Sequence, residues 1–435
     1  MTGGILNLMY TGEEDDHITG NPSITFFKAK YNKHTNFAVE SMNPTCSGTP
    51  DFGNKINITV PRNGDLISSI MLEVEIENPS GQHCYGLGNA LIQQAEVTIG
   101  GQVIDRYTSQ WANIYGELHQ TDEKRRQYDR MVGNVSSAEP TRKKLVIPMR
   151  FWFNGNSGLA LPLIAMSYHE VRIYISFATR DTLLLPADCK IVSFKPWIDY
   201  IYVDTDERRR FAQTNQEYLI EQTQFLGTES FIIPDSNIPA SFNIQLNFNH
   251  PVKQIYFMVE KEGQPCQSIS LHEDRLAQIT LAMNKQECYS NSAETFLHYN
   301  QYKYCSSSSR TNEPIPVDQY ITKPVQGKLI DKALAGNETV AGLTEEFKLL
   351  GSNKKALDAG KYYNQFIYTI SHGLVPEEYQ PSGTVNYSRL DQISLTFDNI
   401  KLEAGGFGKY KLHAYARSYN ILRIQSGMAM LVYAS

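Results

Sequence analysis

Two stretches of this 435-residue chain repeat the same order of strand and aromatic patterns, which restricts the fold more than any single motif. The first pair consists of Ala95–Ile99 with Tyr107 and Trp111–Tyr115, and of Ala277–Leu281 with Tyr289 and Phe296–Tyr299. The second pair consists of Tyr168–Phe177 and Tyr387–Phe397. Similarity this short also arises by chance, but both pairs keep their order, and the wider spacing in the second half coincides with an insertion. The repetition favours tandem β-domains of one topology.

Strand-like runs with turn residues between them make up much of the chain. Met71–Ile76 alternates polar and apolar residues, which gives a strand one buried face. Gly100-Gly101 supplies the positive φ angles of a tight hairpin between two strands. Further strands are expected at Lys55–Val60, Leu66–Ile76, Ala95–Ile99, Gln102–Asp105, Leu145–Phe153, Glu170–Phe177, Ile191–Val203, Glu217–Leu226, Phe242–Phe248, Gln254–Val259, Ala277–Ala282, Tyr362–Ser371, Gln392–Phe397 and Lys409–Ser418. This pattern predicts an all-β chain of sandwiches and not alternating β-α units.

Helical patterns are few, and the second of them marks a change in the chain. Short helices are expected at Ser109–Gln120 and Thr205–Gln213. A fresh series of strands begins after the second helix, so the domain boundary is placed near residue 215. The length suggests two domains, with three as the alternative. The polar segment Ser306–Lys361, with Pro314, Pro316 and Pro324, is expected to be a long surface loop.

Composition argues against a nucleic-acid-binding role. The formal net charge is -6, whereas neutralising phosphates needs a basic face. The two basic clusters, Lys124–Arg126 and Arg208–Arg210, have acidic neighbours and are interpreted as solvated helix or loop ends. The 26 Tyr and 19 Phe favour half-buried pleated surfaces, in agreement with the strand patterns.

The chain shows no pattern of a secreted or membrane-spanning protein. No apolar run approaches the roughly 18 residues of a membrane span, and Thr follows Met1 where N-myristoylation needs Gly. Six scattered cysteines predict reduced thiols, neither a disulfide framework nor a zinc site: Cys46, Cys84, Cys189, Cys266, Cys288 and Cys305. The four N-x-[ST] sequons, at Asn57, Asn134, Asn337 and Asn386, are interpreted as chance matches, with glycosylation as the alternative.

Signatures of catalysis are absent from the sequence. It contains no phosphate-binding Gly loop, no dinucleotide fingerprint and no nucleophile elbow. His169-Glu170 lacks the second His of zinc proteases and is interpreted as structural. The acidic run Glu13–Asp16 with His17, and the pair Glu345-Glu346, have no companion groups that define a site. We therefore expect no enzymatic activity, no cofactor and no metal.

A series of ordered segments runs from residue 19 to the C-terminus: Thr19–Lys28, Tyr31, His34–Ser41, Phe52–Lys55, Arg62–Ile67, Ile99–Asp105, Leu159–Ala165, Tyr168–Val171, Phe211–Gln213, Glu217–Gln222, Leu246–Pro251, Gln380–Gly383, Asn386–Arg389, Tyr419–Ile424 and Ser426–Met428. Together these segments resemble the major capsid proteins of nucleocytoplasmic large DNA viruses, of the chlorella-virus and marseillevirus type. Two parts depart from the family pattern: residues 10–16 are unusually acidic, and Ser306–Lys361 has no counterpart.

The resemblance implies two tandem eight-stranded jelly rolls. The expected parts are an N-terminal arm (residues 1–26), a first jelly roll (27–214) and a second (215–435) with a long surface loop at about 306–361. Asn21, Pro22, Phe26 and Phe27 would anchor the arm; the alternative is ordinary strand-edge packing.

The same resemblance implies the partners and the location. Homotrimers would form pseudo-hexagonal capsomers that contact neighbouring capsomers and tile an icosahedral shell. Minor capsid proteins and an internal viral membrane would lie beneath, without direct nucleic-acid binding. The chain would be a virion component assembled in the host cytoplasm, at a viral factory. Two alternatives stay open: a minor capsid paralogue of the same fold, and a carbohydrate-binding or glycan-processing β-sandwich.

Overall fold

The computed structural model describes residues 3–78, 86–134, 142–183, 185–233, 240–261, 277–308, 366–400 and 408–433. Residues 1–37 and 38–435 form two separate units. The first unit contains the short helices α1 (Gly3–Met9) and α2 (Glu13–Thr19), followed by an extended segment. At the start of α2, the Gly12 N–H donates to the Asp15 carboxylate over 2.9 Å, which closes the first turn.

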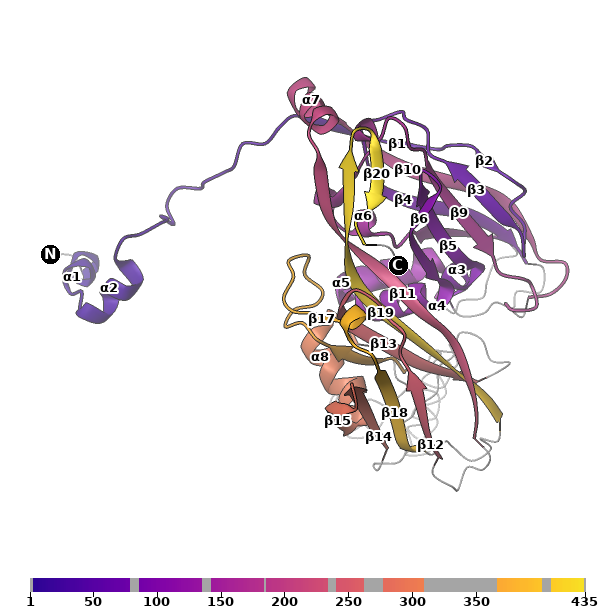
Figure 1. Cartoon of the computed structure of the whole chain (residues 1–435). Helices are drawn as coiled ribbons and strands as arrows, with labels where there is room; N and C mark the ends of the chain where they lie inside the picture. The colour runs from indigo at the N-terminus through magenta and orange to yellow at the C-terminus, as the bar shows by residue number, and fades with distance from the viewer. Residues whose placement is uncertain are drawn as a thin grey trace, which may run out of the picture. The chain divides into compact units, whose positions relative to one another are not determined.

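The second unit consists of two β-sandwiches that follow one another along the chain (Figure 1). In the first sandwich one sheet has the order β1-β10-β4-β7 and the other β2-β3-β9-β5-β6, with β8 paired to β4. Their bounds are β1 Phe37–Met42, β2 Cys46–Ser47, β3 Lys55–Thr59, β4 Leu66–Glu77, β5 Ile92–Ile99, β6 Gln102–Thr108, β7 Arg142–Pro148, β8 Leu161–Pro162, β9 Val171–Phe177 and β10 Lys190–Val203.

The second sandwich repeats this plan. One sheet has the order β11-β19-β13-β16, with β17 paired to β13 and β20 to β19, and the other has the order β12-β18-β14-β15. The bounds are β11 Gln216–Ile233, β12 Ala240–Gln245, β13 Pro251–Lys261, β14 Gln278–Met283, β15 Gln286–Ser292, β16 Tyr368–Ser371, β17 Val385–Asn386, β18 Ile393–Ile400, β19 Gly408–Gln425 and β20 Met428–Leu431. Apart from short accessory strands, each sandwich has eight main strands in the described residues, so the expected fold class is confirmed.

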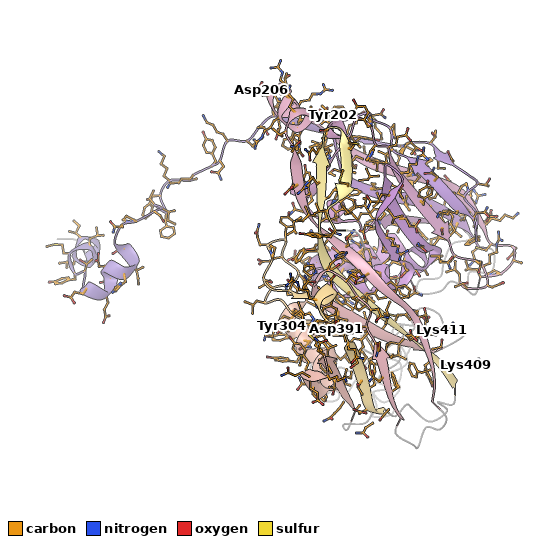
Figure 2. The ribbon with its side chains drawn as sticks, viewed as in Figure 1. Tyr202, Asp206, Tyr304, Asp391, Lys409 and Lys411 are labelled. Carbon is orange, nitrogen blue, oxygen red and sulfur yellow. The ribbon has the colours of Figure 1, made fainter. Side chains whose placement is uncertain are left out.

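Helices are short and lie in the connections. The α-helices are α3 Leu87–Leu91, α4 Ser109–Leu118, α5 Asp122–Val132, α6 Trp152–Gly155, α7 Thr205–Gln213 and α8 Asn300–Tyr304, and η1 Ser157–Leu159, η2 Leu163–Ala165, η3 Thr295–Tyr299 and η4 Tyr387–Arg389 are single turns. The expected helices at 109–120 and 205–213 are confirmed as α4 and α7. Figure 2 marks the passage between the sandwiches by Tyr202, at the end of β10, and Asp206, on α7.

One hairpin of each sandwich has the same irregularities, which sets the register between the two sandwiches. The β5-β6 hairpin turns at Gly100-Gly101 and the β14-β15 hairpin at Asn284-Lys285, and all four residues have positive φ. Each hairpin also has a register shift at the same distance from its turn, after Val97 and after Leu281. Val97 therefore corresponds to Leu281. The repeat predicted from the sequence paired the right strands but was two residues out of register, which preserves the face of each side chain.

The sheets β10-β4 and β19-β13 correspond in the same way. β8 pairs with Leu66 and Ile67 of β4, and β17 pairs with Pro251 and Val252 of β13. One unpaired residue follows in each strand, Ser68 in β4 and Lys253 in β13. From this common point Met71 corresponds to Tyr256, and their cross-strand partners Trp197 and Tyr415 correspond to each other.

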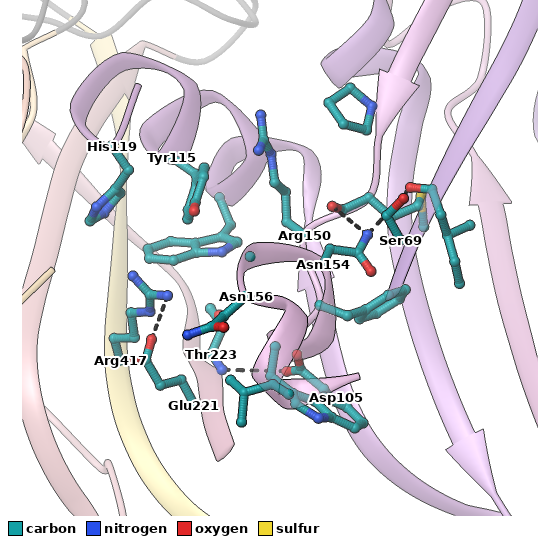
Figure 3. A pocket seen from close by; sticks show the side chains of 18 of the residues that line it. Ser69, Asp105, Tyr115, His119, Arg150, Asn154, Asn156, Glu221, Thr223 and Arg417 are labelled. Atoms are coloured by element: carbon teal, nitrogen blue, oxygen red, sulfur yellow. Dashed lines mark hydrogen bonds and ion pairs between the residues drawn. The ribbon is translucent and has the colours of Figure 1, made fainter. Parts of the chain in front are cut away.

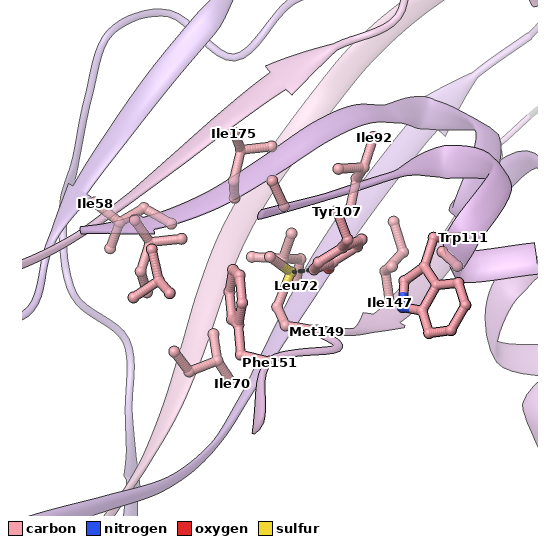
Figure 4. Packing of buried hydrophobic residues seen from close by; sticks show 14 of the residues in the cluster. Ile58, Ile70, Leu72, Ile92, Tyr107, Trp111, Ile147, Met149, Phe151 and Ile175 are labelled. Atoms are coloured by element: carbon pink, nitrogen blue, oxygen red, sulfur yellow. Dashed lines mark hydrogen bonds between the residues drawn. The ribbon is translucent and has the colours of Figure 1, made fainter. Parts of the chain in front are cut away.

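The cores lie between the paired sheets. β4 alternates buried and half-buried residues over most of its length, as its sequence predicts. Figure 4 shows part of the first core, where the Tyr107 hydroxyl donates to the sulfur of Met149 over 3.4 Å. A separate cluster fills the second sandwich and includes Ile255, Phe257 and Leu395. Tyr256, Met258 and Tyr415 belong instead to the first cluster, so the larger core extends onto the second sandwich.

One local expectation differs from the structure, one agrees with it, and one lies largely outside the described residues. The strand expected at Leu145–Phe153 ends at Pro148, and Trp152 begins α6. His169 precedes β9, where its Nδ1 lies 3.1 Å from the carbonyl oxygen and 3.2 Å from the amide nitrogen of Ala429, which agrees with a structural role. The long loop expected at 306–361 lies almost wholly outside the described residues, as do residues 362–365 of the strand expected at Tyr362–Ser371.

The first hairpin gives a testable prediction, because its two glycines differ in their surroundings. A Cβ at Gly100 would lie 2.6 Å from the His169 ring, whereas a Cβ at Gly101 would meet nothing within 4 Å. Both have positive φ, so either Ala variant loses roughly 1–2 kcal/mol from its backbone. Gly100→Ala should lose about 1–3 kcal/mol more through overpacking. Thermal unfolding of both variants checks this, and equal losses would show that His169 moves aside freely.

Candidate functional site: the junction between the sandwiches

The outer face of the β11-β19-β13 sheet is buried, although the outer face of such a sheet usually meets water. In β13, Ile255 and Phe257 point into the second core, and the alternate residues Tyr256 and Met258 point the other way. Tyr256 and Met258 are nevertheless 0 % and 1 % exposed. The first sandwich must therefore cover this face, and the junction between the sandwiches is the best-defined candidate site.

Helix α4 of the first sandwich contributes the central contact. The Trp111 ring lies 5.2 Å from that of Tyr256 and 5.7 Å from that of Tyr415. The hydroxyls of Thr108, just before α4, and of Tyr415 are 2.5 Å apart. Aromatic pairs at these distances stabilise a contact by more than the free energy gained from the area that they bury. This contact joins residues about 300 positions apart, which makes the two sandwiches one packed body.

Beside the aromatic rings lies a buried cluster of charges. Glu221 on β11 pairs with Lys253 on β13 and with Arg417 on β19. Burial is the largest influence on Glu221, but Arg417 and Lys253 outweigh it and lower the pKa of its carboxyl. Burial lowers the pKa of Lys253 to about 7. The cluster keeps its charges paired in a place where a single charge would be costly.

A second polar link runs from the end of α4 to the loop after β16. His119 Nδ1 lies 2.8 Å from Glu377 Oε1, and its Nε2 lies 2.9 Å from the Tyr256 hydroxyl. The amide of Ser306 donates to Glu377 over 2.9 Å. Burial lowers the pKa of His119 below its ordinary value despite the neighbouring carboxylate. This link fixes α4 against two segments of the second sandwich.

A cavity of about 420 Å³ lies beside these groups (Figure 3). Trp111, Tyr115, Arg150, Glu221, Glu377 and Arg417 are among the residues that line it. The guanidinium of Arg150 lies 4.5 Å from the ring centre of Tyr115 and 5.0 Å from that of Tyr128. The cavity at the junction is thus lined by aromatic rings, cations and carboxylates from both sandwiches.

Asp105 completes the junction on the side of the first sandwich. Its carboxyl accepts hydrogen bonds from the amides of Arg106 (2.9 Å) and Thr223 (3.4 Å), so it bridges β6 and β11. Burial raises the pKa of Asp105 to about 8. The Asp105 carboxyl is therefore largely neutral at pH 7, because its charged form would be poorly solvated in the junction.

The site residues proposed from the sequence lie elsewhere. Phe26 and Phe27 are 90 % and 98 % exposed within residues 1–37, and the neighbouring Asn21 and Pro22 are also exposed. Of the sequons, Asn386 is exposed, Asn57 is half-buried in β3 and Asn134 is buried, while Asn337 lies outside the described residues. The structure brings none of these described residues into the junction.

In the described residues, no cluster of three or more His, Cys, Asp or Glu side chains could hold a metal ion. Cys46, Cys189, Cys288 and Cys305 are free thiols, and Cys84 and Cys266 lie outside the described ranges. Every helix in those ranges is too short or too polar to cross a bilayer.

The junction residues were not found from the sequence. Glu221 and Arg417 fall in segments that were expected to be strands, but a charged residue at an alternate strand position indicates a solvated face. The aromatic pattern Trp111–Tyr115 was noticed only as part of the repeat. No local signal distinguishes an outer face that meets water from one that meets another domain.

Two family models cover nearly the whole chain. "Major capsid protein N-terminus" matches residues 25–204, and "Large eukaryotic DNA virus major capsid protein" matches residues 207–430. The major capsid protein of Pyramimonas orientalis virus is 34% identical over 446 residues, covering 100% of both chains. The chain belongs to the major capsid proteins of large eukaryotic DNA viruses.

Other members of this family agree with that assignment. The major capsid protein of Paramecium bursaria Chlorella virus 1 is 34% identical over 475 residues, again covering 100% of both chains. A solved structure described as PBCV-1 VP54, fitted into a reconstruction of the virophage Sputnik, aligns with a TM-score of 0.74 at 27% identity. It covers 94% of this chain and 100% of the other. This capsid protein thus has the double jelly-roll fold and a structural role in the virion.

The charge cluster of this capsid protein gives a prediction with a control on the same strand. Glu221→Gln leaves Lys253 and Arg417 without their carboxylate, so we expect a loss of about 3–5 kcal/mol. Glu217 pairs with Arg423 at 2.7 Å but is 54% exposed, so Glu217→Gln should cost less than about 1 kcal/mol. Denaturant unfolding of the three proteins compares them, and similar losses would mean that the cluster is not effectively buried.

Asp105 gives a prediction about pH. Its pKa rises from 3.8 to about 8 on folding, so between these values the folded chain binds the proton more tightly than the unfolded chain. This group's contribution to stability therefore falls as pH rises from 4 to 8, by up to about 1.4 kcal/mol per pH unit. Asp105→Asn removes the titration and should gain stability relative to the wild type between pH 5 and pH 8.

The measurement is the melting temperature of both proteins across that range. Asp181→Asn, at an exposed position, is the control for the loss of a carboxylate outside the junction. Parallel curves for the wild type and Asp105→Asn would contradict a raised pKa at Asp105.

Proposed function

We propose that three copies of this chain associate into a trimer of pseudo-hexagonal outline, and that such capsomers contact one another to tile an icosahedral shell. The observation that supports this is the equivalence of the two sandwiches, which share strand order, hairpin turns and register shifts. Six similar units arranged in a ring have a near-hexagonal outline, and three two-sandwich chains supply six. Closed symmetric rings are a common outcome for repeated head-to-tail contacts.

The junction supports the head-to-tail arrangement. The first sandwich contributes α4 and the end of β6, whereas the second contributes the outer face of the β11-β19-β13 sheet. The two partners in this contact are different surfaces, so the contact is heterologous. A heterologous contact that repeats with the right rotation closes into a ring, and without closure it continues into a filament.

We further propose the division into an arm (residues 1–26), a first jelly roll (27–214) and a second jelly roll (215–435) with a surface loop at about 306–361. The exposed Phe26 and Phe27, with Asn21 and Pro22, support contacts of the arm with minor capsid proteins beneath the shell. In this proposal an internal viral membrane lies nearby, no nucleic acid is bound directly, and assembly takes place in the host cytoplasm at a viral factory.

The test is the molar mass of the purified protein, measured by light scattering after size exclusion. We expect three times the mass of one chain, unchanged on dilution to about 1 μM, because obligate interfaces bury large areas. A stable monomer at all concentrations would contradict the capsomer proposal and would direct the work to glycan binding.

A further inference from the structure

We propose that the outer face of the β10-β4 sheet, centred on Met71 and Trp197, binds the helical segment Thr295–Tyr304 (η3 and α8) of a second copy of this chain. We call these two surfaces the sheet face and the helical segment. The inference rests on the proposed trimer, because it names the surfaces through which the copies meet.

The sheet face is the counterpart of a surface that is already occupied within the chain. Met71 and Trp197 correspond in register to Tyr256 and Tyr415. Tyr256 and Tyr415 are both 0 % exposed, because Trp111 of the first sandwich packs on them. Met71 and Trp197 point away from their own core and are half-buried in the described part of the chain. The first sandwich therefore presents an equivalent face whose two central residues are only half-buried in the described part of the chain.

The helical segment is the counterpart of α4. It follows hairpin β14-β15 as α4 follows hairpin β5-β6. Phe296 and Leu297 face its own core, and Asn300 donates to the carbonyl of Thr369 over 2.8 Å. Tyr299 and Tyr302 are 56 % and 87 % exposed. In Figure 2 the end of this segment is marked by Tyr304. Two outward tyrosines thus stand where α4 presents aromatic side chains to the second sandwich.

The helical segment carries positive charge, and the sheet face carries charges of both signs, with Lys195 opposite Glu73. On the sheet face, Lys144 lies 2.8 Å from Glu73, and the hydrogen bond between them lowers the pKa of that carboxyl. Asp199 on the same face accepts hydrogen bonds from Ser41 and Ser69. The helical segment contains Lys303 and His298 and no carboxylate. Opposite charges of this kind orient two copies more than they tighten their binding.

The contact also completes the head-to-tail series. In the described residues, each chain makes this contact once internally, and its sheet face and its helical segment keep exposed area. Three copies satisfy all of these surfaces when the sheet face of each takes the helical segment of the next. The contact is then the same at each of the three junctions between copies, and the ring closes.

The first test replaces one aromatic residue on each surface by a charge. Trp197→Asp and Tyr302→Asp should each raise the dissociation constant of the trimer at least about thirtyfold, as central aromatic residues of an interface do. Tyr174 lies on β9, on the outer face of the other sheet, where Lys55 is 4.9 Å from its ring centre. Tyr174→Asp is the matched control and should stay trimeric. Sedimentation velocity over a dilution series measures all four proteins, with circular dichroism to confirm folding.

The second test keeps the charge of both surfaces. A chain with Lys303→Arg and a differently tagged chain with Lys195→Arg are co-expressed, and mixed trimers are isolated through both tags. Lys195 lies opposite Glu73 on the sheet face. Any amine-specific cross-link between Lys195 and Lys303 must then join two copies, because neither chain carries both lysines. We expect this cross-link as a major product.

The outcomes separate this inference from the proposed function. A wild-type protein that is not a trimer overturns the capsomer proposal and this inference with it. A wild-type trimer in which Trp197→Asp and Tyr302→Asp remain trimeric, or in which copies cross-link elsewhere but not between Lys195 and Lys303, overturns the inference alone.

Discussion

The structure depends on the burial of a sheet face that carries both aromatic rings and charges. Trp111 covers Tyr256 and Tyr415, and the ion pairs of Glu221 with Lys253 and Arg417 lie beside them. Burying ion pairs costs desolvation free energy that their attraction only partly offsets, so the aromatic packing must supply the net stabilisation. Glu221, Lys253 and Arg417 all belong to the second sandwich, so polar contacts that cross the junction restrict its geometry instead. His119 contacts Glu377 and Tyr256, and Thr108 contacts Tyr415. The junction therefore behaves as a specific joint that fixes how one sandwich meets the next.

A fixed joint within the chain has consequences for assembly. The family assignment makes the protein a structural component of a capsid, and such a component must present its contact surfaces in one orientation. The internal contact joins a helix of the first sandwich to a sheet face of the second. The equivalent sheet face of the first sandwich and the equivalent helical segment of the second sandwich can therefore make the same contact between copies, always in the same head-to-tail order. The closed trimer that we propose is the simplest arrangement that uses every surface.

The sequence predicts most of the fold, and it predicts the junction poorly. Strand patterns such as Met71–Ile76 depend on local burial, so they appear as alternation in the sequence and were placed correctly. The hairpin at Gly100-Gly101 was found because glycine marks positive φ, whereas the equivalent Asn284-Lys285 has no such mark and β15 was missed. Glu221, Arg417 and His119 could not be identified, because their burial arises from contacts between residues far apart in the sequence. The family resemblance identified the architecture but not the residues that hold it together.

In the proposed trimer, the differences between the two equivalent sheet faces follow from when each face is covered. The face in the second sandwich is covered as the chain folds, and it carries Tyr256, Met258 and Tyr415, almost without exposed surface. At the corresponding positions the first sandwich has Met71, Glu73 and Trp197, which mix apolar area with a charge paired to Lys144. A face that meets water before assembly must keep the unassembled chain soluble, and a contiguous apolar patch would promote aggregation. A mixed face with a central Trp retains one strong contact point while its charged neighbours stay hydrated until the partner arrives. The mixed composition of the face in the first sandwich therefore suits a surface between copies. The apolar, aromatic composition of the face in the second sandwich suits a contact within one chain.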